Sequence, residues 1–224
     1  MLTVLIITGL NAWNDITGPA SEDAEVIEVI GQQFAWTVRY PGVKDKQLGK
    51  VDYRLIDEIN EFGLDLKDQN THDDFKALEL HIPVGKEVLL KIRAKDVLHS
   101  VFLPHFRVKM DAVPGMPTQF KFTATKTTQQ MRDETHNPEF NYEMACTEIC
   151  GRGHFSMRMI VIVEDEASYE KWKAGQDSWL KQNPDKLAEV PANLREAAMI
   201  KAGMAPEPTI TATETEGQSV VGTH

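Results

Sequence analysis

Apolar and polar residues alternate along most of the segment between residues 26 and 163, which is the pattern of β-strands with one buried face. The apolar runs are rich in β-branched and aromatic residues and are separated by turn-forming pairs such as Pro41 and Gly42. The predicted strands are residues 26–30, 33–40, 78–82, 88–94, 97–103, 118–125, 140–144 and 157–163. Short strands at this spacing predict an all-β sandwich or barrel.

The N-terminal residues follow a different pattern. Residues 1–10 are apolar and uncharged, and polar residues begin at Asn11. A membrane-spanning helix needs about 20 apolar residues. We therefore expect residues 1–16 to be the end of a transmembrane helix whose start is missing from this chain, with a buried or interfacial segment as the alternative. Residues 17–25 then form a linker.

The C-terminal part changes from strand to helix periodicity. Apolar residues from Tyr169 to Trp179 recur at helical spacing and predict one amphipathic helix over residues 167–181. This helix belongs to a predicted helical extension over residues 166–204. Residues 205–224 are rich in Thr, Glu and Pro, a composition typical of a disordered tail.

One polar segment interrupts the β pattern. Residues 43–74 carry many Asp and Glu side chains and form an acidic insertion, in which residues 54–62 have the composition of a short helix. We interpret the insertion as a solvated surface excursion, and its His72 as a surface residue. The alternative is that the insertion forms part of an acidic face on which a partner docks.

Charge limits the possible partners. The formal net charge of the 224-residue chain is -10, which argues against nucleic acid as a ligand, because phosphate recognition needs a basic surface. An acidic chain steers cationic proteins toward itself, although charge alone does not identify such a partner.

The two cysteines of the chain belong to a motif with the donor set of a copper site. Cys146, Cys150, His154 and Met157 form the pattern C-x3-C-x3-H-x2-M. Thiolate and thioether sulfurs prefer soft metals such as copper. Blue-copper proteins hold one ion with a single Cys, two His and a Met, whereas two thiolates allow two ions to be bridged. Each ion then needs one nitrogen ligand, and His154 supplies one of them.

The second nitrogen ligand must come from elsewhere in the chain. His99 is the best candidate, because it lies in a predicted strand 47 residues before Cys146 (146 minus 99). Two other interpretations of the cysteine pair remain. Exported proteins often join such a pair as a disulfide, and a Cys2His2 zinc site is chemically feasible, although zinc has no use for Met157.

Three motifs resemble cytochrome c oxidase subunit II. Residues 96–100, Asp-Val-Leu-His-Ser, are similar to the first-histidine motif of that family, and residues 111–115, Asp-Ala-Val-Pro-Gly, to the segment that follows it. Residues 146–157 match the copper loop of the family at each ligand position. The resemblance covers residues 26–163 and implies a cupredoxin-like Greek-key β-barrel or sandwich over residues 26–165.

Carried over residue by residue, the resemblance implies the ligands of a dinuclear copper (CuA) centre. Cys146 and Cys150 would bridge the two ions. His99 and His154 would be the terminal nitrogen ligands, and Met157 would be a weak axial ligand.

The resemblance also assigns roles outside these five residues. The backbone carbonyl of Glu148 would be the other axial ligand, and the Glu148 side chain would help to hold a magnesium ion at the interface with subunit I. Residues 31–36 resemble the aromatic segment through which electrons enter the centre. Many family members have Trp where this chain has Phe34, so we expect Phe34 and Trp36 to share this role from the same side of one strand.

The implied function is that of the electron-transfer subunit of a cytochrome c oxidase, an oxidoreductase complex. Such a chain accepts electrons from cytochrome c and passes them to haem in subunit I, where oxygen is reduced to water. The implied partners are subunits I and III, the cytochrome c donor and the membrane, with the copper domain anchored on the periplasmic face of a bacterial cytoplasmic membrane. The alternatives are the CuA domain of a nitrous oxide reductase and a stand-alone periplasmic copper protein.

Overall fold

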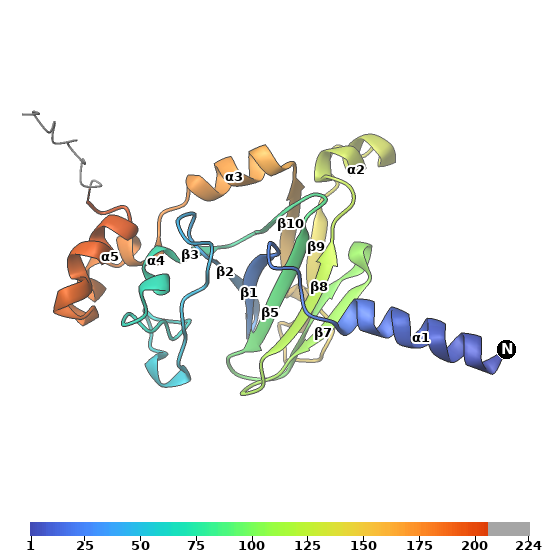
Figure 1. The fold of residues 1–224 in the computed structure, drawn as a ribbon, viewed down its shortest axis with the longest axis horizontal. Coiled ribbons are helices and arrows are strands. Elements are labelled where there is room, and N and C mark those ends of the chain that lie inside the picture. Colours follow the sequence, from blue (N-terminus) through green and yellow to red (C-terminus); the bar gives the residue numbers. More distant parts are fainter. Residues whose placement is uncertain (206–224) are drawn as a thin grey trace, which may run out of the picture.

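The computed structural model describes residues 1–205, and within them it shows two five-stranded β-sheets with helices at the periphery (Figure 1). The strands are β1 (Glu25–Gln32), β2 (Ala35–Tyr40), β3 (Phe75–Ala77), β4 (Leu80–Pro83), β5 (Glu87–Ala94), β6 (His99–Leu103), β7 (Val108–Ala112), β8 (Thr118–Thr123), β9 (Tyr142–Cys146) and β10 (Arg158–Glu164). The α-helices are α1 (Leu2–Thr17), α2 (Thr128–Thr135), α3 (Glu166–Ala174), α4 (Trp179–Gln182) and α5 (Arg195–Lys201). The 3₁₀ segments are η1 (Tyr53–Leu55), η2 (Gln69–Asp73), η3 (Pro104–Phe106), η4 (His154–Ser156), η5 (Pro184–Glu189) and η6 (Ala192–Leu194).

The strand order is β3-β2-β1-β5-β8 in one sheet and β4-β10-β9-β6-β7 in the other. The pairs β1·β5 and β10·β4 are parallel, and the other strand pairs are antiparallel. One hydrophobic core lies between the sheets, with side chains such as Ile27 and Val38 from the first and Met144 and Val161 from the second. The predicted cupredoxin-like β-sandwich is therefore confirmed.

Strands β1 and β2 of the first sheet are buried on both faces along most of their length. Along β1, Ile27 and Val29 point into the core between the sheets, whereas Glu28 and Ile30 point to the outer face and are also buried. Ile30 belongs to a separate apolar cluster, which we call the second core. Its buried members are Ile30, Phe62, Leu64, Leu66, Trp179, Leu180, Val190, Ala198 and Ala202.

The second core corrects the prediction that residues 43–74 are a solvated excursion. Phe62 and Leu64 are each only 1% exposed, because they pack against Trp179 and Leu180 of the C-terminal extension. His72, expected at the surface, is also buried, and its Nε2 lies 3.0 Å from the carbonyl oxygen of Leu66. Together with the C-terminal extension, the insertion therefore covers the part of the outer face of the first sheet around Ile30.

A polar layer lies between the insertion and the sheet. Arg39 Nε and Arg93 Nε donate to the two carboxylate oxygens of Glu28, at 2.6 and 2.7 Å. Arg39 also donates to the carbonyl of Gly49, and Arg93 to the carbonyl of Phe62. Burial raises the pKa of the Glu28 carboxyl, but the two guanidinium groups outweigh it and the net shift is downward.

Helix predictions need three corrections. The helix predicted over residues 167–181 is broken into α3 and α4, because Gly175 ends the first and the Ser178 side chain caps the second. Within residues 54–62 the only helical segment is the short η1. Helix α2 was not predicted, although Thr127 and Gln130 form the capping box that marks its start.

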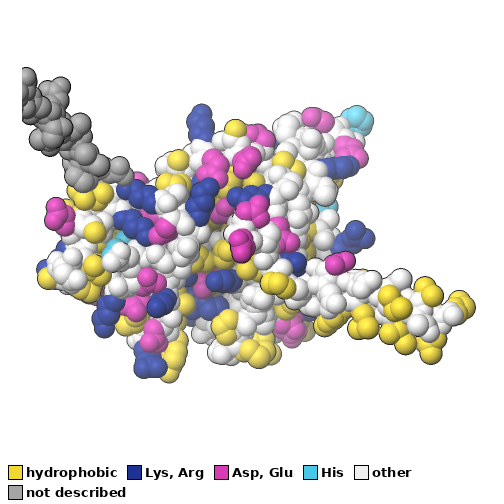
Figure 2. Space-filling model, in the orientation of Figure 1, with side chains coloured by type: hydrophobic (Ala, Val, Ile, Leu, Met, Phe, Trp, Pro, Cys, Tyr) yellow, Lys and Arg dark blue, Asp and Glu magenta, His cyan; other side chains and the backbone are white. Residues whose placement is uncertain are grey.

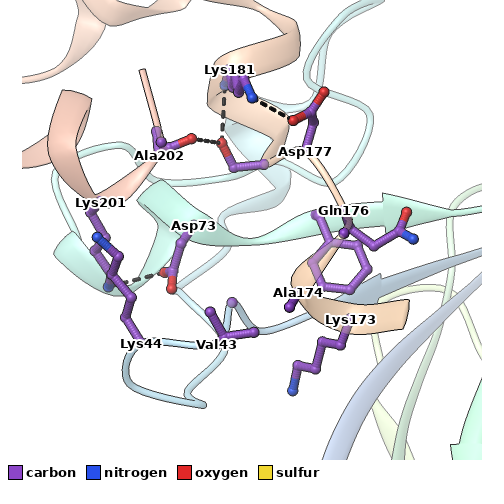
Figure 3. Close-up of a pocket in the computed structure, with 15 residues that line it drawn as sticks. Val43, Lys44, Asp73, Lys173, Ala174, Gln176, Asp177, Lys181, Lys201 and Ala202 are labelled. Carbon is purple, nitrogen blue, oxygen red and sulfur yellow. Dashed lines mark hydrogen bonds and ion pairs between the residues drawn. The ribbon is translucent and has the colours of Figure 1, made fainter. Parts of the chain in front are cut away.

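The extension and the insertion meet at a cavity of about 250 Å³ (Figure 3). Asp73 lies in its wall, with Oδ1 3.1 Å from Nζ of Lys201, and Lys201 also pairs with Asp45. Lys181 pairs with Asp177 on another side of the cavity, at 2.6 Å. The two Lys201 contacts fasten the C-terminal extension to the insertion, whereas the Lys181 pair lies within the extension.

Helix α1 projects away from the sandwich, and apolar side chains lie along it (Figures 1 and 2). Each of its residues has an exposed or half-exposed side chain; Leu5 is 60% exposed and Trp13 64%. Of the helices within residues 1–205, none has both the length and the apolar content that crossing a membrane requires. The tail predicted for residues 205–224 lies outside the described residues, apart from Ala205.

Candidate metal centre

Pairing between β6 and β9 brings the predicted ligand segments together. Val101 of β6 lies opposite Cys146 at the end of β9, so His99 at the start of β6 lies just beyond it. The chain then leaves β9 in a loop of residues 147–157 and returns as β10. Backbone hydrogen bonds from Cys146 to Met157 and from Thr147 to Ser100 close the base of this loop. The ligand spacing in the sequence therefore becomes proximity at one end of the second sheet.

Sulfur and nitrogen atoms converge in this loop. The Sγ atoms of Cys146 and Cys150 are 3.9 Å apart, so the two cysteines are free thiols and not a disulfide. Nδ1 of His99 lies 3.9 Å from Sγ of Cys146, and Nδ1 of His154 lies 3.6 Å from Sγ of Cys150. The donor atoms of His99, Cys146 and Cys150 all lie within 4.8 Å of one another.

Two weaker donors flank the thiols, one on each side. Sδ of Met157 is 3.8 Å from Sγ of Cys150, and the carbonyl oxygen of Glu148 is 3.2 Å from Sγ of Cys146. The fold thus brings together all six donor groups expected from the sequence. The side chain of Glu148 itself is exposed.

These separations suit a metal site. Metal–nitrogen and metal–sulfur bonds are about 2.0–2.3 Å long, so one ion can touch two donors that are 3.6–3.9 Å apart. The thioether and thiols form a soft set that fits copper. A tetrahedral zinc site would leave Met157 unused. The donor set thus fits copper, and its paired thiols allow two ions.

Four of the donor residues are shielded from water, whereas His154 is half-buried. His99 is fully buried, Met157 is 1% exposed, and Cys146 and Cys150 are 7% and 5% exposed. Burial, with the neighbouring Cys146 thiol as a second cause, raises the pKa of the Cys150 thiol to about 11. A metal that binds here must therefore displace thiol protons.

Asp96 orients the His99 ring. Its Oδ1 lies 2.8 Å from Nε2 of His99, which favours a proton on Nε2 and leaves the Nδ1 lone pair directed toward Cys146. Partial burial raises the pKa of the Asp96 carboxyl, but hydrogen bonds from the Gln33 N–H, His99 and the Val97 N–H outweigh it and lower the pKa. Asp96 stands in the motif that pointed to His99, but its role was not predicted.

The two aromatic residues predicted to admit electrons occupy different positions. Phe34 lies in the turn between β1 and β2, is 38% exposed, and its ring packs so closely over Gly151 and Gly153 that a Cβ on either would collide with it. Trp36 is 3% exposed and meets the His99 ring edge-on, with centroids 5.8 Å apart. Strand alternation does not relate the two, because Phe34 precedes β2.

The cavity of Figure 3 plays no part in this centre. Its walls come from the insertion and the C-terminal extension, and none of the six donor residues lines it. One further polar contact at the centre was not expected from the sequence: the Gln33 side chain donates a hydrogen bond to the carbonyl oxygen of Cys150. No sequence motif marks this contact.

Comparisons with known proteins agree with these observations. Residues 25–164 match the family described as cytochrome c oxidase subunit II, periplasmic domain. The chain is 38% identical over 181 residues to the alternative cytochrome c oxidase subunit 2 of Bradyrhizobium diazoefficiens, covering 80% of this chain and 60% of that protein. It is 34% identical over 165 residues to cytochrome c oxidase subunit 2 of Thermostichus vulcanus, and this match covers 74% of this chain and 37% of that protein.

Among solved structures, this chain is similar to the periplasmic domain of subunit II of cytochrome oxidase from Bradyrhizobium japonicum. The TM-score is 0.47 and the sequence identity is 22%, and the match covers 69% of this chain and 94% of that one. The chain spans 60% and 37% of the length of the two sequence relatives. The match over residues 25–164 covers more than half of the chain, and the chain belongs to the cytochrome c oxidase subunit II family.

Proposed function

We propose that this chain is the electron-relay subunit of a cytochrome c oxidase, and that its donor cluster holds a dinuclear copper centre. The observation that carries the proposal is the convergence of two thiols, two imidazole nitrogens and a thioether, with neighbouring donors 3.6–3.9 Å apart. Family membership favours the oxidase over a nitrous oxide reductase domain or a stand-alone copper protein.

Each ligand has a distinct task in this proposal. The thiolates of Cys146 and Cys150 and the imidazoles of His99 and His154 would hold the copper ions. Met157 and the carbonyl of Glu148 would be the weaker ligands. When bound, a copper pair of this kind supplies one-electron redox chemistry in which the charge change is shared by both ions.

The surrounding residues keep the donors in place and exclude water. The β-sandwich fixes His99 and Cys146 on adjacent strands, which limits how far the ligands move when the charge changes. Burial of the thiols and of Met157 keeps solvent from the sulfur atoms. A rigid and dry donor set of this kind suits electron transfer rather than bond-making chemistry.

The two sides of the loop are proposed to serve different partners. Phe34 connects the surface to Gly151 and Gly153 beside Cys150, so we assign the cytochrome c donor to this side. Ile149 is 85% exposed next to Glu148, and exposed apolar residues of this size often mark a protein interface. We assign that side to subunit I, with the Glu148 carboxylate available to a magnesium ion there.

Membrane association is also part of the proposal. The exposed apolar side chains of α1 are suited to contact with lipid or with subunits I and III. In this arrangement the sandwich lies on the periplasmic side, as in the family whose periplasmic domain it matches.

The test is copper loading of the full, reduced chain in detergent. We expect about two copper ions per chain and an electron paramagnetic resonance spectrum of one unpaired electron shared by two nuclei. One ion with a single-nucleus signal would instead support a blue-copper-like carrier. Absence of copper binding, together with oxidation to a disulfide, would contradict the proposal.

A further inference from the structure

Gln33 contacts both segments that carry the metal ligands. Its side-chain Nε2 donates to the carbonyl oxygen of Cys150 at 2.5 Å. Its backbone N–H donates to Oδ2 of Asp96 at 2.7 Å, and Oδ1 of the same carboxylate holds the His99 ring. One residue of the β1–β2 turn thus connects the loop that follows β9 with the segment that precedes β6.

The other hydrogen bonds of the loop are local. Among the contacts described for residues 148–156, the remaining hydrogen bonds stay within residues 146–157, such as those from His154 to Gly151 and from Ser156 to Gly153. The bonds to Met157 and Ser100 fix only the base of the loop. Gln33 is therefore the hydrogen-bonding partner that ties the middle of the loop to the sandwich.

The backbone of Gly151 lies close to the Gln33 side chain and the Phe34 ring. Gly151 has φ +136°, and a Cβ added to it would lie 2.9 Å from Nε2 of Gln33 and 2.9 Å from the Phe34 ring. A side chain larger than hydrogen at Gly151 would push both residues away from the loop. The close approach of Gln33 and the backbone of residue 151 is thus built into the fold.

We propose that Gln33 is a positioning residue for the metal centre. Through Cys150 it fixes one bridging thiol, and through Asp96 it fixes the ring of His99, so that both keep the same relative position. The identity of the metal rests on the proposed function, whereas the positioning role holds for any ion bound by these donors. Removing a hydrogen-bonding partner of a metal ligand typically lowers metal affinity by about 10- to 100-fold.

The test compares Gln33→Met with the parent chain. Methionine has a similar length but cannot donate a hydrogen bond, so it separates the hydrogen bond from packing. We expect the affinity for copper to fall about 10- to 100-fold, so that copper transfer from the loaded chain to an excess of chelator becomes faster. We also expect a changed paramagnetic resonance spectrum, which a purely structural role of Gln33 would not produce. The matched control is Gln32→Ala, at the neighbouring residue in β1. For this variant we expect copper release and a resonance spectrum like those of the parent.

Two further measurements keep the outcome interpretable. Gln33→Lys retains a donor and should restore much of the parent release rate. Amide hydrogen exchange of residues 150–153 in the metal-free chain should be faster in Gln33→Met than in the parent, whether or not metal loading succeeds. Parent-like copper release and parent-like exchange in Gln33→Met would overturn the positioning role. If the parent binds one ion per chain, the oxidase proposal fails, yet the release comparison with that ion still tests Gln33.

Discussion

The imidazole of His81 stacks on the indole of Trp172, with ring centroids 3.9 Å apart and planes 7° from parallel. This pair joins β4 to α3, and Tyr40 packs edge-on against the same indole, with centroids 5.1 Å apart. Nδ1 of His81 is further held by Glu164, 2.9 Å away. The stack therefore anchors the start of the C-terminal extension to the sandwich.

Removing this anchor should loosen the extension without affecting the metal centre. Trp172 is half-buried, so we expect Trp172→Ala to lower the free energy of unfolding by about 2 kcal/mol, somewhat less than for a fully buried tryptophan. Urea unfolding measures this loss. Trp13→Ala, in the exposed helix α1, is the matched control and should change stability by less than about 0.5 kcal/mol. An equal loss in both variants would show that the stack contributes nothing specific.

The thiol and thioether ligands should respond differently to substitution. Cys150→Ser removes one bridging sulfur and should abolish the shared two-copper signal. Met157→Leu removes only a weak ligand, so the copper pair should remain and its reduction potential should shift. Paramagnetic resonance and voltammetry of the loaded chains distinguish these outcomes. An unchanged copper spectrum in Cys150→Ser would falsify the ligand assignment.

Phe34 and Ile149 should affect different partners. Truncation of an interface aromatic residue commonly costs about 1–2 kcal/mol, so Phe34→Ala should slow electron uptake from reduced cytochrome c by about 5- to 30-fold. Ile149→Ala lies on the side assigned to subunit I and should leave this rate unchanged. Stopped-flow reduction of the copper-loaded chain measures both, and the copper spectrum of each variant shows whether the centre is intact. A slow rate in Ile149→Ala alone would reverse the assignment of the two sides.

A buried ion pair fastens α3 to the first strand. Nζ of Lys173 lies 2.6 Å from Oε1 of Glu25, and both side chains are almost completely buried. Lys173→Met leaves the Glu25 carboxylate buried with only Lys86, 3.7 Å away, and should lower the free energy of unfolding by about 3–5 kcal/mol. The double substitution Glu25→Leu with Lys173→Met should recover most of that loss. Urea unfolding of the four chains forms a double-mutant cycle, and additive losses would argue against coupling.

Asp57 should contribute to stability in a defined pH range. The backbone N–H of Asn60, followed by the Lys186 side chain and the N–H of Ile59, lowers the pKa of Asp57 in the folded chain to about 2. In the unfolded chain the pKa is about 3.9. Because the folded-state pKa is the lower one, the contribution is present above pH 4 and is lost as the pH falls from about 4 to 2.

Asp57→Asn should therefore lose this dependence. Its midpoint of urea unfolding should decline less steeply than that of the parent between pH 4 and pH 2, and its stability at pH 7 should be lower. Unfolding curves at several pH values measure both effects. Parallel declines in parent and variant would exclude Asp57 as the source.

Local patterns in the sequence predicted eight of the ten strands described for residues 1–205, but not the short β3 and β7, and they indicated the candidate donor residues. The spacing of Cys146, Cys150, His154 and Met157 is short, so the ligands of one loop could be recognised together. His99 followed from its place in a predicted strand. The contact of Gln33 with Cys150 could not be predicted, because it depends on how the β1–β2 turn sits against a loop 117 residues away.

The insertion was misinterpreted for a related reason. Phe62, Leu64 and Leu66 alternate with Gly63 and Asp65, which is a strand-like pattern in a strongly acidic context. Their partners Trp179 and Leu180 are remote in the sequence, and nothing near residue 62 indicates them. Charge density describes the exposed side of such a segment and says little about its buried side.

The second core also sets an order of events during synthesis. Phe62 cannot be covered by Leu180 until 118 more residues (180 minus 62) have been added. At bacterial or eukaryotic translation speeds this takes roughly 6 to 24 s. During that interval the apolar side chains of the insertion face water, and the neighbouring Glu61 and Asp65 act as gatekeepers that discourage association between nascent chains. We therefore expect the acidity of the insertion to limit aggregation while the chain is still incomplete.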